Sequence, residues 1–373
     1  MDQLTCQNWP CWMVHRTGTV ASMRRQEFHG SEALGQQLFA ELEVMQVAGI
    51  GPEGQPVLKS VNGVVDDGWV CFHGSPAGEK TSLVGRPVVA SVEETVARLP
   101  SYFLDAERAC PATTLYRAAQ AHGVLQAIEE PVRKVRVLQR LMEKLQPEGG
   151  YVPLAAESPL YRAQVKGLLI AGFPLAALTT KAKLAQNRTP EQRGVLLEKL
   201  WQRGAPGDVR ALELIREANP QTPVPAFLSS PEGTTLHPWL EAAHAAAAAE
   251  LLAGEYWNDV FSTEDLVRAH RGSTAWVGAR DATGALVGTA RALADGGKYA
   301  WVYDVCVRGD FRRRGLGKAL MRLLLDYPAV RRCRVVRLGT RDAQTLYQGF
   351  GFVPLTLLPP RPYPTTEMLL RRA

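Results

Sequence analysis

One short stretch of the chain combines the residue types that bind anions. It contains three consecutive arginines, two glycines and a lysine, in the order Arg312, Arg313, Arg314, Gly315, Leu316, Gly317 and Lys318. Glycines let a ligand approach the backbone closely, and the basic side chains add positive charge. The stretch therefore indicates a phosphate site, and in particular a site for pyrophosphate.

A strand and a helix must position this stretch. Residues 299–307 form an apolar strand pattern, and residues 317–327 carry apolar side chains at helical spacing. The first N–H groups of a helix have no partners within it, and the helix dipole adds partial positive charge there. A strand, a loop with glycines and a helix N-terminus together predict an anion cradle.

The pattern Arg312-x-x-Gly315-x-Gly317 after an apolar strand resembles the acetyl-CoA signature of the GNAT superfamily of N-acetyltransferases. It is neither the dinucleotide pattern GxGxxG nor a P-loop. Residues 343–352 resemble the last helix and strand of that family, in which a tyrosine, here Tyr347, acts as general acid toward the CoA thiolate. The resemblance covers residues 236–373. It implies that Val305, Cys306 and Val307 hold the pantetheine arm, and that residues 312–318 hold the pyrophosphate of acetyl-CoA.

The roles of two residues near this site stay open. Tyr347 is either the acid or a buried structural tyrosine packed beside Leu346 and Phe350. Asp304 lies on the face of the strand opposite Val305, so it either accepts the amine proton, directly or through water, or binds the substrate ammonium or a backbone group.

Further side chains of the cofactor strand also have two interpretations. Cys306 shares the face of Asp304, which leaves a cysteine acyl-enzyme open, although direct transfer is the usual route of the superfamily. Tyr299, Trp301 and Tyr303 either shape an acceptor pocket or form one face of a pleated core.

The N-terminal half alternates short strands with turns. Strand patterns occupy residues 44–50, 56–65, 69–73 and 87–92, and turn signals such as Asp66-Asp67-Gly68 separate them. This spacing suggests a small antiparallel barrel. A helix is predicted at residues 131–145.

The strand at residues 69–73 runs into His73-Gly74-Ser75, and Lys80 follows. Gly74 permits close backbone approach, while Ser75 and Lys80 offer a hydroxyl and a charge to a phosphate. Here residues 20–190 resemble the FMN-binding split-barrel family, the relatives of pyridoxamine-phosphate oxidase. The resemblance implies FMN contacts from Ser60, His73, Gly74, Ser75, Lys80 and Tyr116.

Two features of this loop leave the flavin assignment open. A phosphate-contacting arginine is common in the family, whereas this loop offers Lys80, with Arg86 next in line. His73 is either a flavin contact or a histidine at a strand end that bonds backbone groups.

These patterns predict a multidomain α+β protein. Residues 1–188 form an N-terminal antiparallel split β-barrel that binds FMN, residues 189–235 a helical and proline-rich linker, and residues 236–373 a GNAT domain with a mixed α/β sheet. The prolines at 220, 223 and 225 favour a stiff extended connection.

The composition and charge of the chain argue against several classes of protein. The chain has 373 residues, a net charge of +6 and six cysteines without a CxxC pair. Such a modest charge and the lack of a helix-turn-helix pattern argue against nucleic acid as a partner. No metal-ligand spacing, signal peptide or membrane-spanning stretch is found, so a cytoplasmic protein is expected.

The predicted function is acetyl-CoA-dependent N-acetylation of a small amine by the GNAT domain, which is fused to a flavin-binding barrel. The alternatives are a flavin-dependent oxidoreductase and a regulatory protein that senses the cofactor. By resemblance to split barrels, a homodimer is expected. The acceptor amine cannot be identified from the sequence, because function depends on the site and not on the fold.

Overall fold

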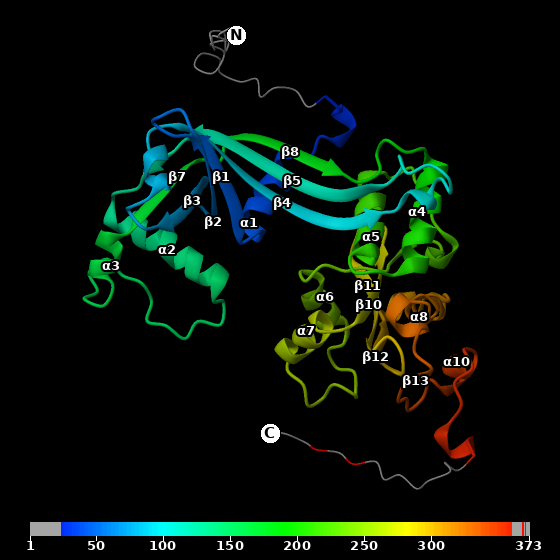
Figure 1. Ribbon diagram of the computed structural model, residues 1–373. Coiled ribbons are helices and arrows are strands. Elements are labelled where there is room, and N and C mark those ends of the chain that lie inside the picture. Colours follow the sequence, from blue (N-terminus) through cyan, green and yellow to red (C-terminus); the bar gives the residue numbers. More distant parts are fainter. Residues whose placement is uncertain (1–23, 360–367, 369, 371–373) are drawn as a thin grey trace. The chain divides into compact units, whose positions relative to one another are not determined.

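The protein, seen here in a computed structural model that describes residues 24–359, 368 and 370, consists of two compact units. The first unit comprises Met1–Leu200 and Ala205–Pro223, and the second comprises Trp201–Gly204 and Val224–Ala373. The division falls inside the predicted connection of residues 189–235. Each unit has its own sheet and its own buried core (Figure 1).

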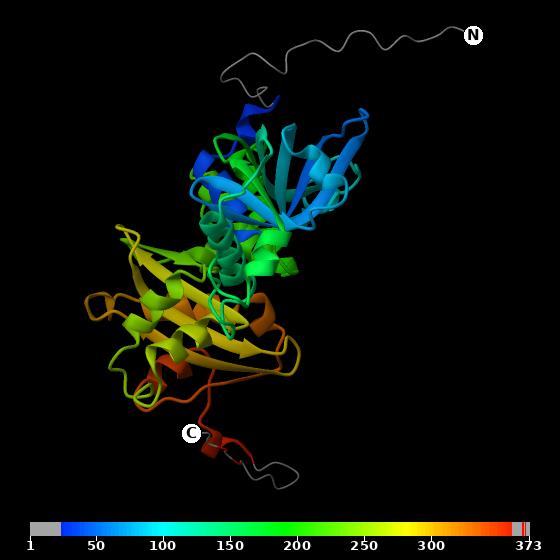
Figure 2. The same cartoon turned by 90° about the vertical axis from the view of Figure 1, so that its left-hand side faces the viewer.

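An antiparallel sheet of eight strands forms the first unit. Its order is β6-β7-β3-β2-β1-β4-β5-β8, and the strands are β1 (Val44–Ile50), β2 (Pro56–Asp66), β3 (Trp69–Gly74), β4 (Pro87–Leu99), β5 (Thr113–Val124), β6 (Gln126–Ala127), β7 (Leu169–Pro174) and β8 (Ala177–Lys183). The sheet curls on itself (Figure 1, Figure 2). A Cβ added at Gly123 of β5 would lie 2.3 Å from Phe173 of β7. The predicted antiparallel barrel is confirmed.

Alternation along the strands separates core from surface. Met45 and Val47 of β1 point inward and are 1% exposed, whereas Val44 and Ile50 point outward and are more than half exposed. This is the two-residue period of a strand with one buried face. The inward side chains pack into one core with Leu38 of α1 and Phe173 of β7.

Five helices accompany this sheet within the described part of the chain: α1 (Glu32–Glu41), α2 (Pro131–Leu145), α3 (Arg162–Gly167), α4 (Pro190–Arg203) and α5 (Asp208–Ala218). The predicted helix at residues 131–145 is confirmed. Pro131 begins it because a missing N–H costs nothing at that position. Glu130 caps its N-terminus by accepting hydrogen bonds from the next two N–H groups.

The second unit contains a mixed five-stranded sheet. Its order is β13-β12-β11-β10-β9, and the strands are β9 (Thr234–His237), β10 (Ala275–Asp281), β11 (Leu286–Ala294), β12 (Tyr299–Val307) and β13 (Val335–Arg337). Only the pair β12–β13 is parallel among these neighbours. The predicted mixed sheet is therefore confirmed.

Helices cover both faces of this sheet (Figure 1). They are α6 (His244–Leu251), α7 (Thr263–Arg271), α8 (Leu316–Leu325), α9 (Pro328–Arg331) and α10 (Gln344–Gln348). A Cβ at Gly288 would lie 2.8 Å from Leu320, so that side of β11 faces α8. Trp276 packs with Ala245 and Ala248 on the other side, which faces α6 and α7.

Ser262 begins α7 with a capping box, because its hydroxyl accepts from the N–H of Asp265 and that carboxylate accepts from the N–H of Ser262. In the described residues, no helix is long and apolar enough to cross a membrane.

Candidate functional site

Within the described residues, strand β12 has an open edge. It pairs with β11 over most of its length, but with β13 only from Tyr299 to Trp301. Beyond Trp301 the two parallel strands separate, and Val305, Cys306 and Val307 lie in this region. Unpaired strand groups can bond an extended ligand as a further strand would.

A β-bulge interrupts β12 at Asp304. The register with β11 shifts between Thr289 and Arg291, and Asp304 has a φ of 52°, in the left-handed region. Neighbouring residues of a regular strand point to opposite faces, yet Tyr303 and Asp304 both contact Arg291. The bulge therefore turns both side chains toward the face covered by α7.

Both oxygens of Asp304 are engaged. Oδ2 forms an ion pair with Nε of Arg291, and Oδ1 accepts a hydrogen bond from Nε1 of Trp257 at 3.2 Å. The aspartate is 8% exposed. Because both oxygens already bond Arg291 and Trp257, the carboxylate suits a positioning role better than that of a base.

Cys306 is buried on the same face. Its thiol contacts the carbonyl of Leu251 at 3.2 Å and Oε1 of Glu255 at 3.7 Å. Burial, reinforced by the charge of Glu255, raises the pKa of the thiol to about 11. Because the thiolate is the nucleophile, this environment argues against a cysteine acyl-enzyme.

Helix α8 begins without a side-chain cap. Its N-cap residue Gly315 has a φ of 86°, which glycine adopts without strain. A Cβ at Gly317 would have only Val307 nearby, at 3.9 Å. No side chain therefore bonds the first-turn N–H groups, which leaves them available to an anion at this helix N-terminus.

The four basic residues around this turn have different surroundings. Arg312 is bound within the protein, because it pairs with Glu255 at 2.8 Å and donates to the carbonyl of Val307 at 2.7 Å. The guanidinium of Arg314 lies 5.2 Å from the ring centre of Phe311. Arg313 adopts a left-handed φ of 61°. Lys318 instead lines a cavity beside the turn.

This cavity has a volume of about 500 Å³. Besides Gly315 and Lys318, it is lined by Arg322 of α8, by residues of α10 and by the segment of residues 229–231. Arg322 donates to the carbonyl of Ser229. Nothing in the sequence pattern linked Arg322 or Ser229 to the anion cradle, because their proximity arises only from folding.

Tyr347 lies on α10 and is 9% exposed. Burial, together with the neighbouring Tyr256 and Asp342, raises the pKa of its phenol. A phenol with a raised pKa keeps its proton and can donate it. The ring also packs edge-on against Phe352, with centroids 6.0 Å apart.

The loop of residues 255–257 connects Asp304 with the segment that carries Tyr347. The hydroxyl of Tyr256 accepts from the N–H of Arg341 at 3.2 Å, next to the helix that carries Tyr347. Its ring packs edge-on against Trp257, which donates to Asp304. No role for this loop was predicted from the sequence, although two adjacent aromatic residues, Tyr256 and Trp257, were a possible signal.

In the first unit, five of the six predicted FMN contacts lie near one end of the β2–β3 hairpin. These are Ser60, His73, Gly74, Ser75 and Lys80. A Cβ at Gly74 would lie 2.2 Å from Cε of Lys80, so the lysine side chain lies directly over this glycine. Ser60 donates to the side chain of Gln46, and Ser75 accepts from the N–H of Ala77.

His73 has an unsatisfied ring nitrogen. Its Nδ1 is buried and has no hydrogen-bond partner among the described residues. Burial, and then the charge of Lys80, lowers the pKa of the ring, so it stays neutral. Nδ1 is thus not bonded to a backbone group, and this free nitrogen favours a ligand contact.

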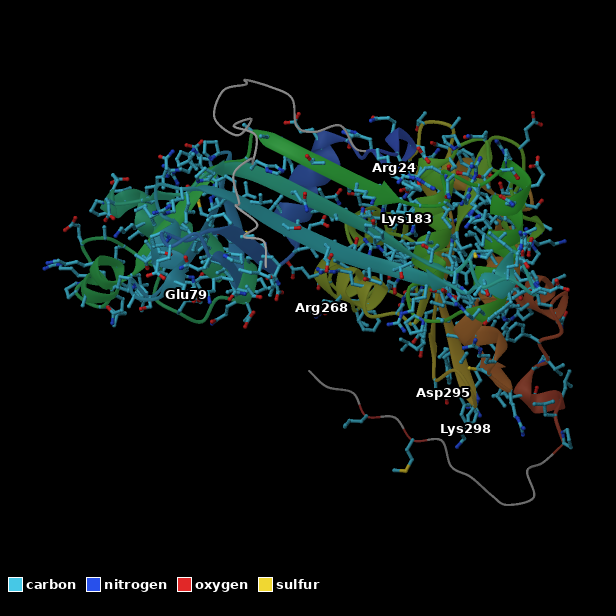
Figure 3. All side chains as sticks on the ribbon, turned by 45° about the horizontal axis from the view of Figure 1, so that its top comes forward. Arg24, Glu79, Lys183, Arg268, Asp295 and Lys298 are labelled. Carbon is cyan, nitrogen blue, oxygen red and sulfur yellow. The ribbon has the colours of Figure 1, made fainter. Side chains whose placement is uncertain are left out.

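Tyr116 lies elsewhere in the same chain. It pairs with Lys183 of β8, and the ammonium groups of Lys181 and Lys183 approach its ring at 5.4 and 5.9 Å. Figure 3 shows Lys183 far from Glu79, the neighbour of Lys80. One copy of the chain therefore does not bring Tyr116 to the other predicted FMN contacts.

No group of three or more His, Cys, Asp or Glu side chains lies close enough to hold a metal ion in the described ranges.

Two separate parts of the chain match known protein families. Residues 236–352 match the Acetyltransferase (GNAT) family, and residues 35–181 match the family named Pyridoxamine 5'-phosphate oxidase. The chain thus joins a GNAT domain, and with it an acyltransferase, to a domain of the pyridoxamine-phosphate oxidase type. Both resemblances found in the sequence are confirmed.

Three solved structures are similar to parts of the chain. The flavocytochrome Anf3 of Azotobacter vinelandii is 15% identical with a TM-score of 0.35, over 41% of this chain and 67% of that chain. An FAD and heme binding protein of Mycobacterium smegmatis is 17% identical with a TM-score of 0.34, over 42% and 72%. A GNAT-family protein of Xanthomonas campestris is 26% identical with a TM-score of 0.30, over 36% and 96%. No curated protein matches the chain.

Proposed function

We propose that the GNAT domain transfers the acetyl group of acetyl-CoA to a small amine, and that the barrel joined to it binds FMN. The observation that carries the first part is the open edge of β12 beside the uncapped N-terminus of α8. An acetyl donor whose extended arm is joined to a pyrophosphate matches both features at once.

The donor would lie along β12 and end at α8. Backbone groups of Val305, Cys306 and Val307 bond the pantetheine amides, and the first N–H groups of α8 bond the pyrophosphate. Lys318 and Arg322 supply positive charge in the adjacent cavity. Arg312 is not assigned to the pyrophosphate, because it bonds Glu255 and the carbonyl of Val307. These bonds hold the basic turn against β12.

In the reaction, the amine nitrogen attacks the thioester carbonyl, the C–S bond breaks, and the thiolate takes up a proton. Tyr347 donates that proton from its phenol, which burial keeps protonated. Asp304 orients the bulge through Arg291 and Trp257. Transfer is direct, since Cys306 is held as a neutral thiol.

Observations of the first unit support a flavin. The orphaned Nδ1 of His73 lies in the range of the charge of Lys80, and the lysine side chain packs over Gly74 beside it. Lys80 and Ser75 would bind the phosphate, while His73 and the strand of Ser60 would contact the ring. Bound flavin would supply two-electron redox chemistry, which belongs to the cofactor.

A homodimer accounts for the position of Tyr116, because a second copy can supply it to the site that one chain leaves incomplete. Val44, Ile50 and Leu58 are each more than half exposed on the outer side of the β1–β2 pair, where a second copy would cover them.

Three measurements test these assignments. Calorimetry with acetyl-CoA tests donor binding, and release of CoA thiol in the presence of a panel of amines tests transfer. Absorbance at the flavin bands tests the barrel. If flavin is bound and no amine releases CoA, the alternative of a flavin-dependent oxidoreductase is favoured. A bound flavin without turnover of any reductant favours a sensing role.

A further inference from the structure

An aromatic stripe runs along β12 toward the bulge. Tyr299, Trp301 and Tyr303 occupy alternate positions and therefore share one face. The rings of Trp301 and Tyr303 are nearly parallel, with centroids 6.1 Å apart. Tyr299 is 50% and Trp301 40% exposed, so the α6–α7 side of the sheet leaves these rings open to solvent.

The bulge connects this stripe to the site. In a regular strand Asp304 would point away from Tyr303, but here both contact Arg291. The stripe therefore ends at the side chain that contacts Trp257, in the loop next to Tyr347. A ring bound on Trp301 would have its substituents close to the place where the acetyl group is transferred.

Positive charge flanks the stripe. The guanidinium of Arg337 lies 5.8 and 5.9 Å from the rings of Tyr299 and Trp301, and that of Arg291 lies 4.9 Å from Tyr303. The ammonium of Lys298, labelled in Figure 3, lies 6.0 Å from Tyr299. These cations lie close to the rings and disfavour a substrate that carries further positive charge.

The nearby carboxylates are bound within the protein. Asp304 pairs with Arg291, and Glu255 pairs with Arg312. Asp295, also labelled in Figure 3, accepts from the N–H groups of Gly297, Lys298 and Tyr299. In the described residues around the stripe, these three carboxylates are thus engaged and poorly placed to deprotonate an ammonium.

We propose that the acceptor is an aromatic amine whose nitrogen is uncharged at neutral pH, with its ring stacked on Trp301. This inference rests on the acetyltransferase function proposed above and names its substrate class. The nitrogen of an arylamine attacks without prior deprotonation. A bond forms between nitrogen and the acetyl carbon, the C–S bond breaks, and one proton passes from nitrogen to the thiolate, which leaves an N-acetylarylamine and CoA.

The test compares acceptors of different charge. Aniline and 4-aminobenzoate are neutral at nitrogen, phenethylamine is aromatic but cationic, and spermidine is a polycation without a ring. CoA release at pH 7.5 should give the highest kcat/KM with the two arylamines. Higher kcat/KM with spermidine or phenethylamine would overturn the inference and leave the acetyltransferase function intact.

Two variants test the role of the stripe. Trp301→Ala should raise the KM for 4-aminobenzoate about three- to tenfold, as expected for a lost aromatic pair, while the affinity for acetyl-CoA stays unchanged. Trp239→Ala is the control, because Trp239 is 37% exposed in the same unit but lies outside the stripe. An equal KM in both variants would contradict the proposal.

A binding measurement separates this inference from the function on which it rests. Calorimetry of 4-aminobenzoate into protein saturated with CoA should show binding that Trp301→Ala weakens. If acetyl-CoA does not bind, or if no amine releases CoA, the proposed function fails. If acetyl-CoA binds and other amines react while 4-aminobenzoate neither binds nor reacts, only the present inference fails.

Discussion

At the scale of single residues, the surroundings of a side chain decide which chemistry it can perform. Tyr347 and Cys306 are both buried near β12, and burial raises the pKa of each. The phenol therefore keeps its proton until the thiolate forms beside it, and its higher pKa also makes it a weaker acid. For Cys306 as a nucleophile, burial is a disadvantage, because the thiolate is disfavoured.

Replacement of Tyr347 by phenylalanine removes the hydroxyl and keeps the ring. We expect kcat to fall about a hundredfold or more, with little change in acetyl-CoA affinity, because the proton is needed only as the thiolate leaves. Steady-state kinetics with the best acceptor measure this loss. Tyr327→Phe is the control, since burial raises the pKa of that tyrosine to about 12 without bringing it into the site. Normal turnover of Tyr347→Phe would make Tyr347 a structural residue.

Lys80 should dominate phosphate binding in the barrel. Lys80→Ala removes one charge-assisted hydrogen bond, worth about 1.5–3 kcal/mol, so FMN affinity should fall roughly ten- to a hundredfold. Titration of FMN fluorescence gives the dissociation constant. Lys166→Ala, an exposed lysine of the same unit, should bind FMN normally. An unchanged constant for Lys80→Ala would remove the lysine from the site.

At the scale of elements, the start of α8 allows a test that separates binding from folding. A side chain at Gly315 would be strained, because its φ is 86°. Gly317 has ordinary backbone geometry, and a Cβ there meets Val307 at 3.9 Å. Gly317→Val should therefore fold, yet its side chain should obstruct the first-turn N–H groups.

Acetyl-CoA affinity of Gly317→Val should fall at least about tenfold, since the pyrophosphate loses its hydrogen bonds to the backbone. Calorimetry measures the affinity, and the melting temperature reports folding. Gly297→Val, at an exposed turn of the same unit, is the control. Wild-type affinity in Gly317→Val would show that the N-terminus of α8 does not bind the donor.

The contact between β2 and α2 should make the first unit sensitive to acid. Asp66 is fully buried and bonds Arg136 and Arg140. Burial alone would raise the pKa of Asp66, but the two arginines outweigh it and lower the pKa below the usual value. The stabilisation is therefore present above about pH 4 and is lost as pH falls through the lowered pKa.

Urea unfolding of the first unit at pH 7 and at pH 3 measures this dependence. Asp66→Asn should lower the free energy of unfolding at pH 7 and make it less dependent on pH. Asp67→Asn should leave the dependence near wild type, because the side chain of Asp67 is 82% exposed. Equal pH dependence in wild type and Asp66→Asn would refute the assignment.

At the scale of the whole molecule, the proposed homodimer can be tested on the outer face of the barrel. Leu58 is 62% exposed and lies opposite Ala48 on that face. Leu58→Asp should convert a dimer into a monomer and weaken FMN binding, because a charge would be buried at the interface. Light scattering gives the mass. Val132→Asp, equally exposed on α2, should remain dimeric. A monomeric wild type would exclude this arrangement.

The sequence by itself determined the features that depend on neighbouring residues. The apolar pattern of β12 and the apolar spacing of α8 predict both elements, and Gly315 and Gly317 at the start of α8 predict the anion cradle. The β2–β3 hairpin was likewise predicted from its Asp66-Asp67-Gly68 turn. Periodicity and turn preference are local properties, so a single sequence contains them.

Only the tertiary structure decided which of these side chains are free to act. Arg312 belongs to the predicted phosphate motif, but Glu255, distant in sequence, pairs with it. The sequence predicted Asp304 as a candidate base, but in the folded protein Arg291 and Trp257 bond its carboxylate. The bulge that brings them together was not predicted by any sequence pattern. An ion pair between distant segments forms because folding brings them together, and its energy depends on burial and geometry, which local spacing does not specify.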